Sequence, residues 1–384
     1  MKTVYAVLGS GMQGTAAAYD LAKYGEAAAI KMGDMCATQA EKSAHRVNQL
    51  TGDTLCEHHQ VDAMDDESLN DFLEGSHILL SCVPYWMHPR IAKAAIAKGV
   101  HMVDLGGNTD ITMETLHMDE TAKAAGVTCV PDTGLAPGLV NSLGSWMIEN
   151  IEKCDTVKLY CGVLPQHPQP PFNYKLTFNV EGLVTEYDYE AVALRNNEIT
   201  MIPTLTETEE LHIEQLGQME AFVTSGGTST APYTHKGKVT NYEYKTIRHP
   251  GHGFLMKIFK DFGFWSEDLV DVRGVQVRPK DVFNAVFGPN LDRFKDEDLC
   301  AIRAVGIGTE NGQPCRKQID IFDKQCPTTG FTSMERLTGF SMAIYAKEIA
   351  DGNVKPGCVR YEDAVSGTKF VEEIQKRGIA LKFS

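Results

Sequence analysis

A glycine-rich turn near the start of the sequence constrains the fold more than any other feature. The apolar run 4–8 is followed directly by GSGMQG at 9–14, and then by a stretch of helical character up to Lys23. The first glycine of such a turn permits a sharp bend, the second lets the backbone approach a ligand, and the third lets the helix pack on the strand. The free N–H groups at the helix start bind phosphate. The predicted phosphate-binding residues are Gly9, Gly11, Met12, Gln13 and Gly14.

An acidic residue, Asp34, lies about twenty positions further on, at the end of a second apolar stretch, 27–30. A carboxylate there accepts hydrogen bonds from the adenosine ribose hydroxyls and repels a ribose phosphate. The residues at 35–38 offer no arginine to neutralise such a phosphate. The sequence therefore predicts NAD as the cofactor in preference to NADP. The competing interpretation is a glycine-rich turn in an unrelated sheet protein.

Strand-like and helix-like segments then alternate up to about residue 131. Predicted helices at 38–50, 67–72, 89–98 and 113–125 separate predicted strands at 60–63, 77–84, 100–107 and 127–131. This alternation is typical of a doubly wound parallel sheet, which binds ligands at the carboxyl ends of its strands. We expect a Rossmann domain over 1–145. The strand-end residues that complete its predicted cofactor site are Asp62, Cys82, Val83, Pro84, Leu105 and Gly106.

The pattern changes after about residue 150. A proline-rich link at 165–171 follows the first strand candidate, and few crossover helices are evident. We predict an α+β domain over 146–332, and we expect helices in 333–384 to pack back on the first domain. The strand candidates of the second domain are 156–163, 175–180, 220–224, 242–248, 271–277, 301–308 and 318–322.

Composition narrows the range of possible binding partners. The 384 residues suit two domains, and a formal charge of −15 argues against a nucleic-acid partner. No apolar run approaches the roughly 18 residues of a membrane span, and the N-terminus lacks a signal sequence, so a cytoplasmic location is expected. None of the ten cysteines forms a Cys-x-x-Cys pair, and the histidine groups at 56–59 and 249–252 lack further ligands. We therefore expect no metal site.

The sequence resembles the saccharopine dehydrogenase-like family over nearly its whole length, most specifically at 131–141, and within it the branch that oxidises lysine at C6. The matching segments are GSGMQG at 9–14, VDLGGN at 103–108, PDTGLAPG at 131–138, PPFNY at 170–174, EGLVTEY at 181–187, EAFVTSGGTST at 220–230 and EYKTIRHPGH at 243–252. The resemblance implies a reaction in which lysine and NAD give 2-aminoadipate 6-semialdehyde (allysine), ammonia and NADH.

This chemistry needs a base and an anion anchor. A primary amine has a pKa near 10.4, so a base or a desolvating pocket must free its lone pair. Asp132 and Asp104 end predicted strands and are the candidate catalytic residues; a helix-capping role for Asp132 is the alternative. Arg248 is the candidate for the substrate carboxylate. Three hydrogen-bonding residues complete the predicted substrate site, Tyr174, Thr228 and Ser229, although 224–230 also suits a plain turn.

The sequence leaves several roles open. His249 and His252 could relay protons or form a surface turn, and Lys245 could act as a base only if buried. A secondary amine such as saccharopine or a carboxyspermidine-type compound is the second enzymatic interpretation. A phosphorylating semialdehyde dehydrogenase would need a reactive cysteine, for which Cys154 is the nearest candidate. A non-catalytic NAD-binding sensor is the remaining class. We expect a homodimer or homotetramer.

Overall fold

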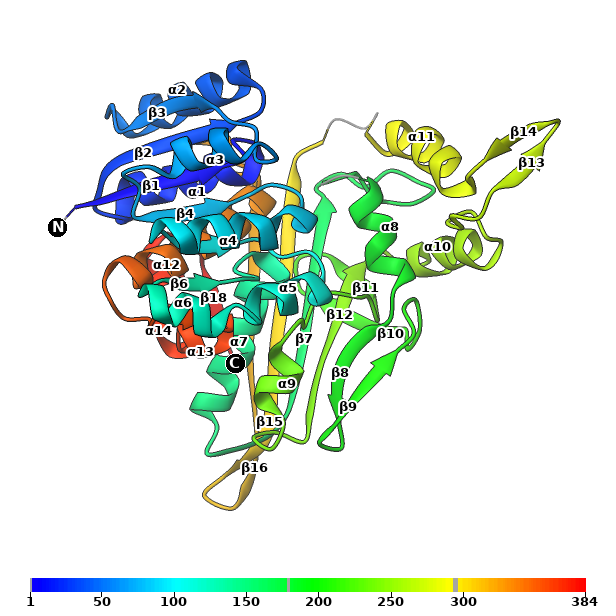
Figure 1. Ribbon diagram of the computed structural model, residues 1–384. Coiled ribbons are helices and arrows are strands. Elements are labelled where there is room, and N and C mark those ends of the chain that lie inside the picture. The colour runs from blue at the N-terminus through cyan, green and yellow to red at the C-terminus, as the bar shows by residue number, and fades with distance from the viewer. Residues whose placement is uncertain (1, 178–179, 293–295) are drawn as a thin grey trace.

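The computed structural model describes residues 2–177, 180–292 and 296–384, which form two large sheets side by side (Figure 1). The first sheet has seven parallel strands in the order β17-β6-β5-β4-β1-β2-β3. The strand order reverses between β1 and β4, and that is where doubly wound sheets bind dinucleotides. The bounds are β1 Thr3–Leu8, β2 Ala27–Asp34, β3 Cys56–Gln60, β4 Ile78–Ser81, β5 His101–Asp104, β6 Thr128–Val130 and β17 Gly357–Cys358.

Helices cover both faces of this sheet, and their ends follow from local chemistry. The Asp65 side chain accepts a hydrogen bond from the Ser68 N–H and so begins α3, and Asn108 begins α5 in the same way. Gly99 ends α4 in the left-handed conformation, which glycine adopts without strain. The bounds are α1 Met12–Tyr24, α2 Ala37–Thr51, α3 Asp66–Leu73, α4 His88–Lys98, α5 Thr109–Leu116 and α6 Asp119–Ala125.

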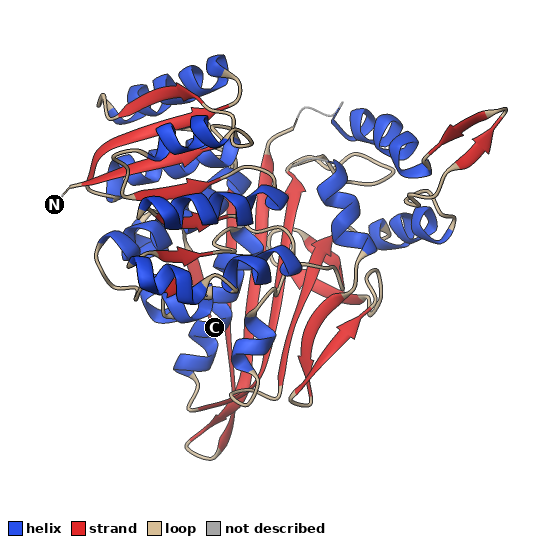
Figure 2. Ribbon diagram, in the orientation of Figure 1, coloured by secondary structure: helices blue, strands red, loops and turns tan. Residues whose placement is uncertain are grey.

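The second sheet has nine strands and is mixed (Figure 2). Its centre is the parallel pair β12–β7, and β7 pairs antiparallel with β15. The long strands β15 and β16 form a hairpin that turns at Asn311 and Gly312, both with positive φ. The bounds are β7 Lys153–Pro165, β8 Ala191–Arg195, β9 Glu198–Ile202, β10 Glu209–Ile213, β11 Gly217–Phe222, β12 Asn241–Arg248, β15 Asp298–Glu310, β16 Gln313–Lys324 and β18 Leu381–Phe383.

An arm extends from this second sheet on the side away from the first sheet (Figure 1). It consists of α10 (His252–Asp261), the hairpin β13 (Val270–Val272) and β14 (Val275–Val277), and α11 (Pro279–Asp292). Its inner side packs on α8 (Val180–Asp188) around Tyr187, Trp265 and Phe283.

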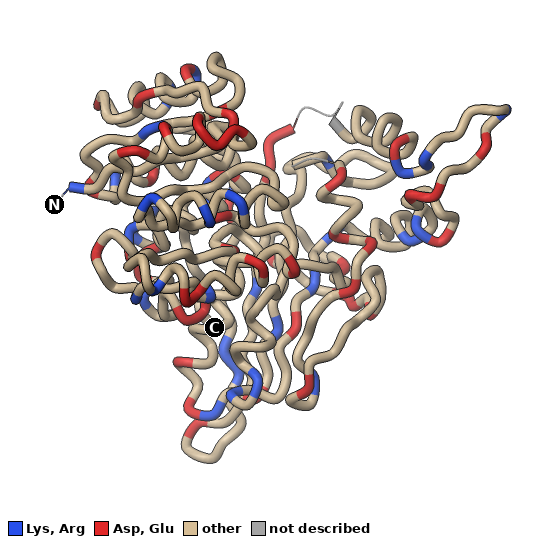
Figure 3. Tube along the Cα trace, in the orientation of Figure 1, with Lys and Arg blue, Asp and Glu red and all other residues tan. Residues whose placement is uncertain are grey.

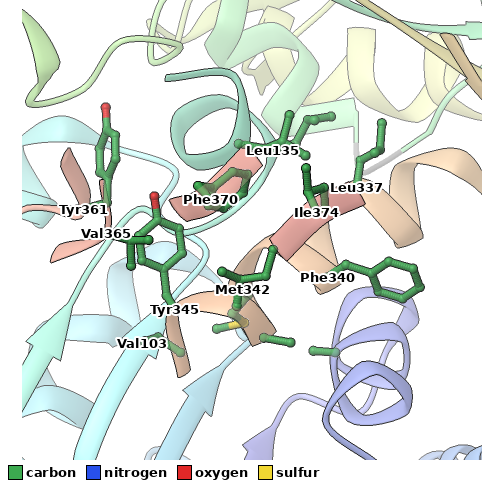
Figure 4. Close-up of a cluster of buried hydrophobic side chains, with 14 of the residues drawn as sticks. Val103, Leu135, Leu337, Phe340, Met342, Tyr345, Tyr361, Val365, Phe370 and Ile374 are labelled. Atoms are coloured by element: carbon green, nitrogen blue, oxygen red, sulfur yellow. The ribbon is translucent and has the colours of Figure 1, made fainter. Parts of the chain in front are cut away.

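The C-terminal helices return to the first domain, as the sequence predicts. Helix α12 (Ser333–Ala350) lies so close to α1 that a Cβ on Gly339 would be 2.7 Å from the Ala17 nitrogen. Helix α14 (Gly367–Lys376) makes a similar approach to α7 (Val140–Asn150) at Gly367. The aromatic and aliphatic side chains between these helices form one buried cluster (Figure 4). Two shorter helices, α9 (Ala231–His235) and α13 (Tyr361–Ala364), complete the fold.

Four predicted segments are wrong in detail. The strand expected at 60–63 is β3, which ends at Gln60, and the helix expected at 113–125 is two helices, α5 and α6. No strand occupies the described part of 175–180, because Val180 already begins α8; residues 178 and 179 lie outside the described chain. The strand expected at 271–277 is a hairpin that turns at Arg273 and Gly274, both with positive φ. The terminal strand β18 pairs with β16 of the second sheet.

Candidate functional site

The glycine turn has the geometry of a phosphate-binding loop. A Cβ on Gly9 would lie 2.6 Å from the Cys82 carbonyl oxygen, and one on Gly14 would lie 2.1 Å from the Gly9 carbonyl oxygen. Gly11 faces open space and precedes α1, whose first N–H groups have no side-chain cap. Met12 is exposed beside it and Gln13 is half-buried. The residues present therefore fit a dinucleotide pyrophosphate, which would lie on the helix N-terminus.

Asp34 lies next to this turn. Its carboxylate accepts one hydrogen bond from the Ser10 N–H and another from the Cys36 N–H, both at 2.9 Å. These contacts hold the side chain at the end of β2, where a ribose would bind. Asp62 follows β3, is exposed, and accepts a hydrogen bond from the Met64 N–H at 2.8 Å. It lies at the same sheet edge.

The loops after β4 and β5 connect the cofactor site to the predicted catalytic residues. Cys82, Val83 and Pro84 follow β4, and Leu105 follows β5. The Gly106 N–H donates to the Asp104 carboxylate at 2.8 Å, and a Cβ on Gly106 would lie 1.9 Å from the Asp132 carboxylate. Only glycine fits at that position without moving Asp132.

Asp132, in the loop after β6 of the first sheet, is hydrogen-bonded to a loop of the second sheet. Its buried carboxylate accepts a hydrogen bond from the Thr112 hydroxyl at 3.0 Å and another from Ser229, which belongs to the loop after β11. Its own N–H donates to Asp104 at 3.1 Å. Asp132 and Ser229 both have positive φ, a conformation that costs energy and is concentrated at functional sites. The predicted capping role is wrong, because neither α7 nor the turn before it has a side-chain cap.

Burial sets the protonation of this carboxyl. Desolvation, reinforced by the negative charge of Asp104, raises the pKa of Asp132 to about 7, although the hydrogen bonds from Ser229 and Thr112 oppose the shift. A carboxyl with such a pKa exchanges a proton readily near neutral pH.

A second buried carboxyl lies next in the same network. The Thr230 hydroxyl lies 2.7 and 3.0 Å from the two carboxylate oxygens of Glu362, a residue of α13. Desolvation raises the pKa of Glu362 to about 8. The adjacent Tyr361 donates its hydroxyl proton to the Thr228 carbonyl oxygen at 2.9 Å. The C-terminal segment therefore supports the loop that carries Ser229.

Arg248 ends β12 and is buried. Its Nε donates to the Tyr187 hydroxyl at 2.9 Å, and its guanidinium carbon lies 4.9 Å from the centre of the Tyr174 ring. One terminal nitrogen is bonded to the Ile247 carbonyl oxygen at 3.0 Å, and the other lies 3.4 Å from Glu186. The aromatic rings hold the guanidinium in place, which suits an anchor for an anion.

His252 extends this chain of hydrogen bonds. The Tyr187 hydroxyl lies 3.1 Å from His252 Nε2, and His252 Nδ1 lies 3.2 Å from the Phe172 carbonyl oxygen. Burial and the charge of Arg248 lower the pKa of His252 to about 3, so the ring is neutral and orients Tyr187. Pro250 and Gly251 form an exposed turn, as the surface-turn interpretation predicts, but His252 itself is buried. Its lowered pKa contradicts a role as a neutral-pH proton relay.

Lys245 and Cys154 are both buried, and neither has the surroundings of a catalytic group. The ammonium of Lys245 lies 2.8 Å from Glu209 and 2.8 Å from the Glu207 carbonyl oxygen, so it is already paired. Cys154 lies in β7, where desolvation raises the pKa of its thiol to about 11. A thiol with that pKa is not the activated nucleophile that a phosphorylating semialdehyde dehydrogenase needs.

The predicted site thus forms two connected groups. One is Asp132 with Asp104 and Ser229, and the other is Arg248 with Tyr174. The loop 224–230 contacts both groups: Ser229 donates to Asp132, and the Thr224 hydroxyl lies 2.7 Å from the hydroxyl of Thr246, which precedes Arg248 by two residues in β12. The Thr228 hydroxyl donates to the Val192 carbonyl oxygen at 2.6 Å and so fixes this loop.

Sequence reasoning missed four residues of this neighbourhood. Tyr187 lies within the EGLVTEY segment that marked the family, so a buried tyrosine at a helix end was the available signal. Thr230 ends the EAFVTSGGTST segment that also marked the family, whereas Thr112 had no signal in the sequence. Glu362 lies more than two hundred positions after Asp132, and only the fold brings it near.

Comparison with known proteins decides the family. The model of the saccharopine dehydrogenase C-terminal domain matches residues 134–379, and that of the saccharopine dehydrogenase NADP binding domain matches residues 5–130. The chain belongs to the saccharopine dehydrogenase family. This membership confirms the predicted class, an oxidoreductase that acts on amino compounds, and its nicotinamide dinucleotide cofactor.

Curated relatives of this family are distant in sequence. The chain is 26% identical over 219 residues to the saccharopine dehydrogenase [NADP(+), L-glutamate-forming] of Pyricularia oryzae, an alignment that covers 54% of the chain and 48% of that protein. It is 20% identical to the Schizosaccharomyces pombe protein of the same name, over 84% of the chain and 87% of the relative. The chain thus matches about half the length of the first of these relatives.

Solved structures confirm the fold. Saccharopine dehydrogenase (L-Glu forming) from Saccharomyces cerevisiae has a TM-score of 0.79 at 16% identity, with 100% of this chain and 99% of that chain covered. Homospermidine synthase from Legionella pneumophila, solved with NAD, has a TM-score of 0.68 at 13% identity, with 100% and 91% covered. Both share the Rossmann domain joined to a second α+β domain.

Membrane spans and metal clusters are both missing from the part of the chain that the structure describes. Within those residues, no helix is long and apolar enough to cross a membrane. The same residues contain no group of three or more His, Cys, Asp or Glu side chains placed to hold a metal ion.

Proposed function

We propose that the protein catalyses the NAD-dependent oxidation of the terminal amine of L-lysine. The C6–H bond breaks as hydride leaves for the nicotinamide, the free amine supplies its lone pair to form a C=N bond, and one proton is released. Water then adds to the imine, and ammonia leaves to give 2-aminoadipate 6-semialdehyde. The observation that carries the proposal is a buried carboxyl, Asp132, with a pKa of about 7, linked through one loop to a buried arginine.

Asp132 is the proposed base. In its ionised form it accepts a proton from the substrate ammonium, which otherwise has no lone pair to assist hydride departure. Ser229 and Thr112 hold the carboxylate in one orientation by donating to its two oxygens. The Asp104 carboxylate accepts hydrogen bonds from the Gly106 and Asp132 N–H groups and so fixes the main chain at both residues. Glu362 accepts a hydrogen bond from Thr230, the residue next to Ser229, and so supports the loop that orients the base.

Arg248 is the proposed anchor for the substrate α-carboxylate. Its guanidinium lies against the rings of Tyr174 and Tyr187, so a carboxylate would be bound with little competing water. The other basic side chains of this part of the chain are engaged or remote. Arg195 pairs with Glu207 and Glu243, Lys245 pairs with Glu209, and Lys236 and Lys238 are exposed. Arg248 itself lies 3.4 Å from Glu186. A single arginine matches the one carboxylate of lysine better than the three carboxylates of saccharopine.

NAD is the proposed cofactor. Asp34 is held by two backbone N–H groups at the position of the adenosine ribose. Its negative charge would repel the extra phosphate of NADP, and residues 35–41 contain no Lys or Arg to offset it. The name of the matching family model refers to NADP, so this preference is a specific property proposed for this chain.

The anchor is tested with a substrate that lacks the carboxylate. In wild-type protein, kcat/KM for L-lysine should exceed that for 1,5-diaminopentane. Arg248→Met should lower kcat/KM for lysine by about 100-fold, because a charge-assisted contact is lost, and should leave the diamine rate within about threefold. An equal loss on both substrates would refute an anchor role and indicate a structural one. Lys238→Met, which removes an exposed cation, is the matched control.

A saccharopine-type secondary amine is the second candidate, favoured by the names of the relatives. Saccharopine has three carboxylates, so its binding would need two further carboxylate-binding groups besides Arg248. Oxidation of saccharopine at a rate above that of lysine would replace the first proposal with this one.

A further inference from the structure

The arm carries about half of the exposed large hydrophobic side chains of the described residues. Within the described residues, ten of the nineteen exposed large hydrophobic side chains lie in 254–286, which is about a tenth of the chain. They are Phe254, Ile258, Phe262, Phe264, Leu269, Val270, Val272, Val275, Val282 and Val286. Phe262 is 78% exposed and Phe254 is 70% exposed. Soluble monomers rarely expose apolar side chains in such a concentration, so the arm has the character of an interaction surface.

The hairpin of the arm is amphipathic, and its apolar face lies in solvent. Val270 pairs with Val277 and Val272 pairs with Val275, so all four valines share one face. Asp271 and Gln276 form the pair on the other face, where their side chains are hydrogen-bonded at 3.3 Å. A two-stranded hairpin with no third strand or covering helix is marginal by itself. Figure 1 shows this hairpin projecting away from both sheets.

We infer that a second copy of this chain covers the arm, so that two arms pack together with the valine faces of their hairpins buried. Both the charge and the area of the arm agree with this occupant. Residues 254–291 contain five basic and five acidic side chains, although the whole chain has a net charge of −15. Figure 3 shows both signs interspersed along the arm. Because the arm carries no net charge, two copies can meet there without bringing like net charges together.

The area is that of a stable dimer. With side chains of roughly 150 to 200 Å², the exposed fractions of the ten apolar residues amount to roughly 900 Å² for each chain. Stable interfaces bury about 800 Å² for each partner. A two-fold axis places identical faces against each other, and it allows the free edges of the two hairpins to pair as well.

The contact would also stabilise the proposed anchor site. Helix α10 begins at His252, which orients Tyr187, and its inner side buries Met256. Phe254 and Ile258 on the outer side of the same helix are exposed. A partner that covers them would hold α10 in place. The inference does not depend on which amine the enzyme oxidises.

The test is the mass of the protein in solution. Sedimentation velocity on the full chain at about 10 µM should give a dimer, and the double variant Val272→Asp/Val275→Asp should be monomeric. The control Gln276→Asp adds a charge to the polar face of the same hairpin and should stay dimeric. Circular dichroism checks that each variant is folded. A monomeric wild-type protein, or an unchanged mass in the double variant, would overturn the inference.

A cross-link identifies the occupant directly. Benzoylphenylalanine placed at Val275 should link to residues 250–291 of a second, isotopically labelled copy, and the same probe at Gln276 should not. Links from position 275 to the first domain, or only within one chain, would contradict packing of arm on arm.

Discussion

Replacing Asp132 with asparagine should change how the stability of the protein depends on pH. The carboxyl is buried, and its pKa is about 7 in the folded protein against 3.8 for the free side chain. Because the folded-state pKa is the higher one, the folded protein holds this proton more tightly than the unfolded chain. The stability that the proton contributes is complete below about pH 4 and is lost as pH rises through about 7.

The magnitude follows from this shift. Each pKa unit corresponds to about 1.4 kcal/mol, so wild-type protein should lose about 2 to 3 kcal/mol of unfolding free energy between about pH 5 and pH 8 through this group. The Asp132→Asn protein has no such proton, so it should not show this loss of unfolding free energy. Replacing the protonated carboxyl with an amide also changes the hydrogen bonds with Ser229 and Thr112, and this part of the cost does not vary with pH.

Urea unfolding at a series of pH values measures the effect. The difference in unfolding free energy, wild type minus variant, should fall by about 2 to 3 kcal/mol from about pH 5 to pH 8. Asp53→Asn, which changes an exposed carboxylate, should show no such trend. A difference that is constant within about 0.5 kcal/mol would refute the raised pKa, and with it the basis for assigning Asp132 as the base.

Three further predictions concern separate parts of the molecule. Ser229→Ala removes a hydrogen bond that lowers the pKa of the buried base, so the acid limb of the kcat/KM profile should move to higher pH; Ser225→Ala, in the same loop, should leave it in place. Asp34→Ser should lower kcat/KM with NAD by about 10-fold or more and reduce the discrimination against NADP; an unchanged ratio of the two cofactors would count against the ribose contact. Arg377→Met leaves the buried Asp20 carboxylate, 2.8 Å away, without its partner and should cost about 3 to 5 kcal/mol by thermal denaturation; adding Asp20→Asn should recover part of it.

The first domain was predictable because its signals are local. The glycines of the turn, the strand-end aspartates and the alternation of strands and helices each depend on a few adjacent residues. The strand β17 was not predictable, since two residues near the C-terminus join the first sheet beside β6 through tertiary packing alone. The hairpin at 270–277 resembled one strand because Arg273 and Gly274 interrupt the valine pattern only briefly.

The residues of the candidate site also differ in whether the sequence could predict them. Asp132, Asp104 and Ser229 were predicted separately, and the structure places them in direct hydrogen-bonded contact across the two sheets. Of the surroundings of Arg248, Tyr174 was predicted, but Tyr187 and the state of His252 were not. Helix α8 supplies Tyr187 in a segment where a strand was expected just upstream, and burial makes His252 neutral. Burial and nearby charge depend on the folded chain, so no residue pattern indicates them.

The central claim is the oxidation of lysine with NAD, and the initial rate of absorbance at 340 nm tests it most directly. Purified wild-type protein is assayed with L-lysine and with saccharopine, each with NAD and with NADP. The predicted result is NADH formation from lysine, with kcat/KM at least about 10-fold above that for saccharopine and above that with NADP. Reduction by saccharopine alone, or with NADP alone, would contradict it.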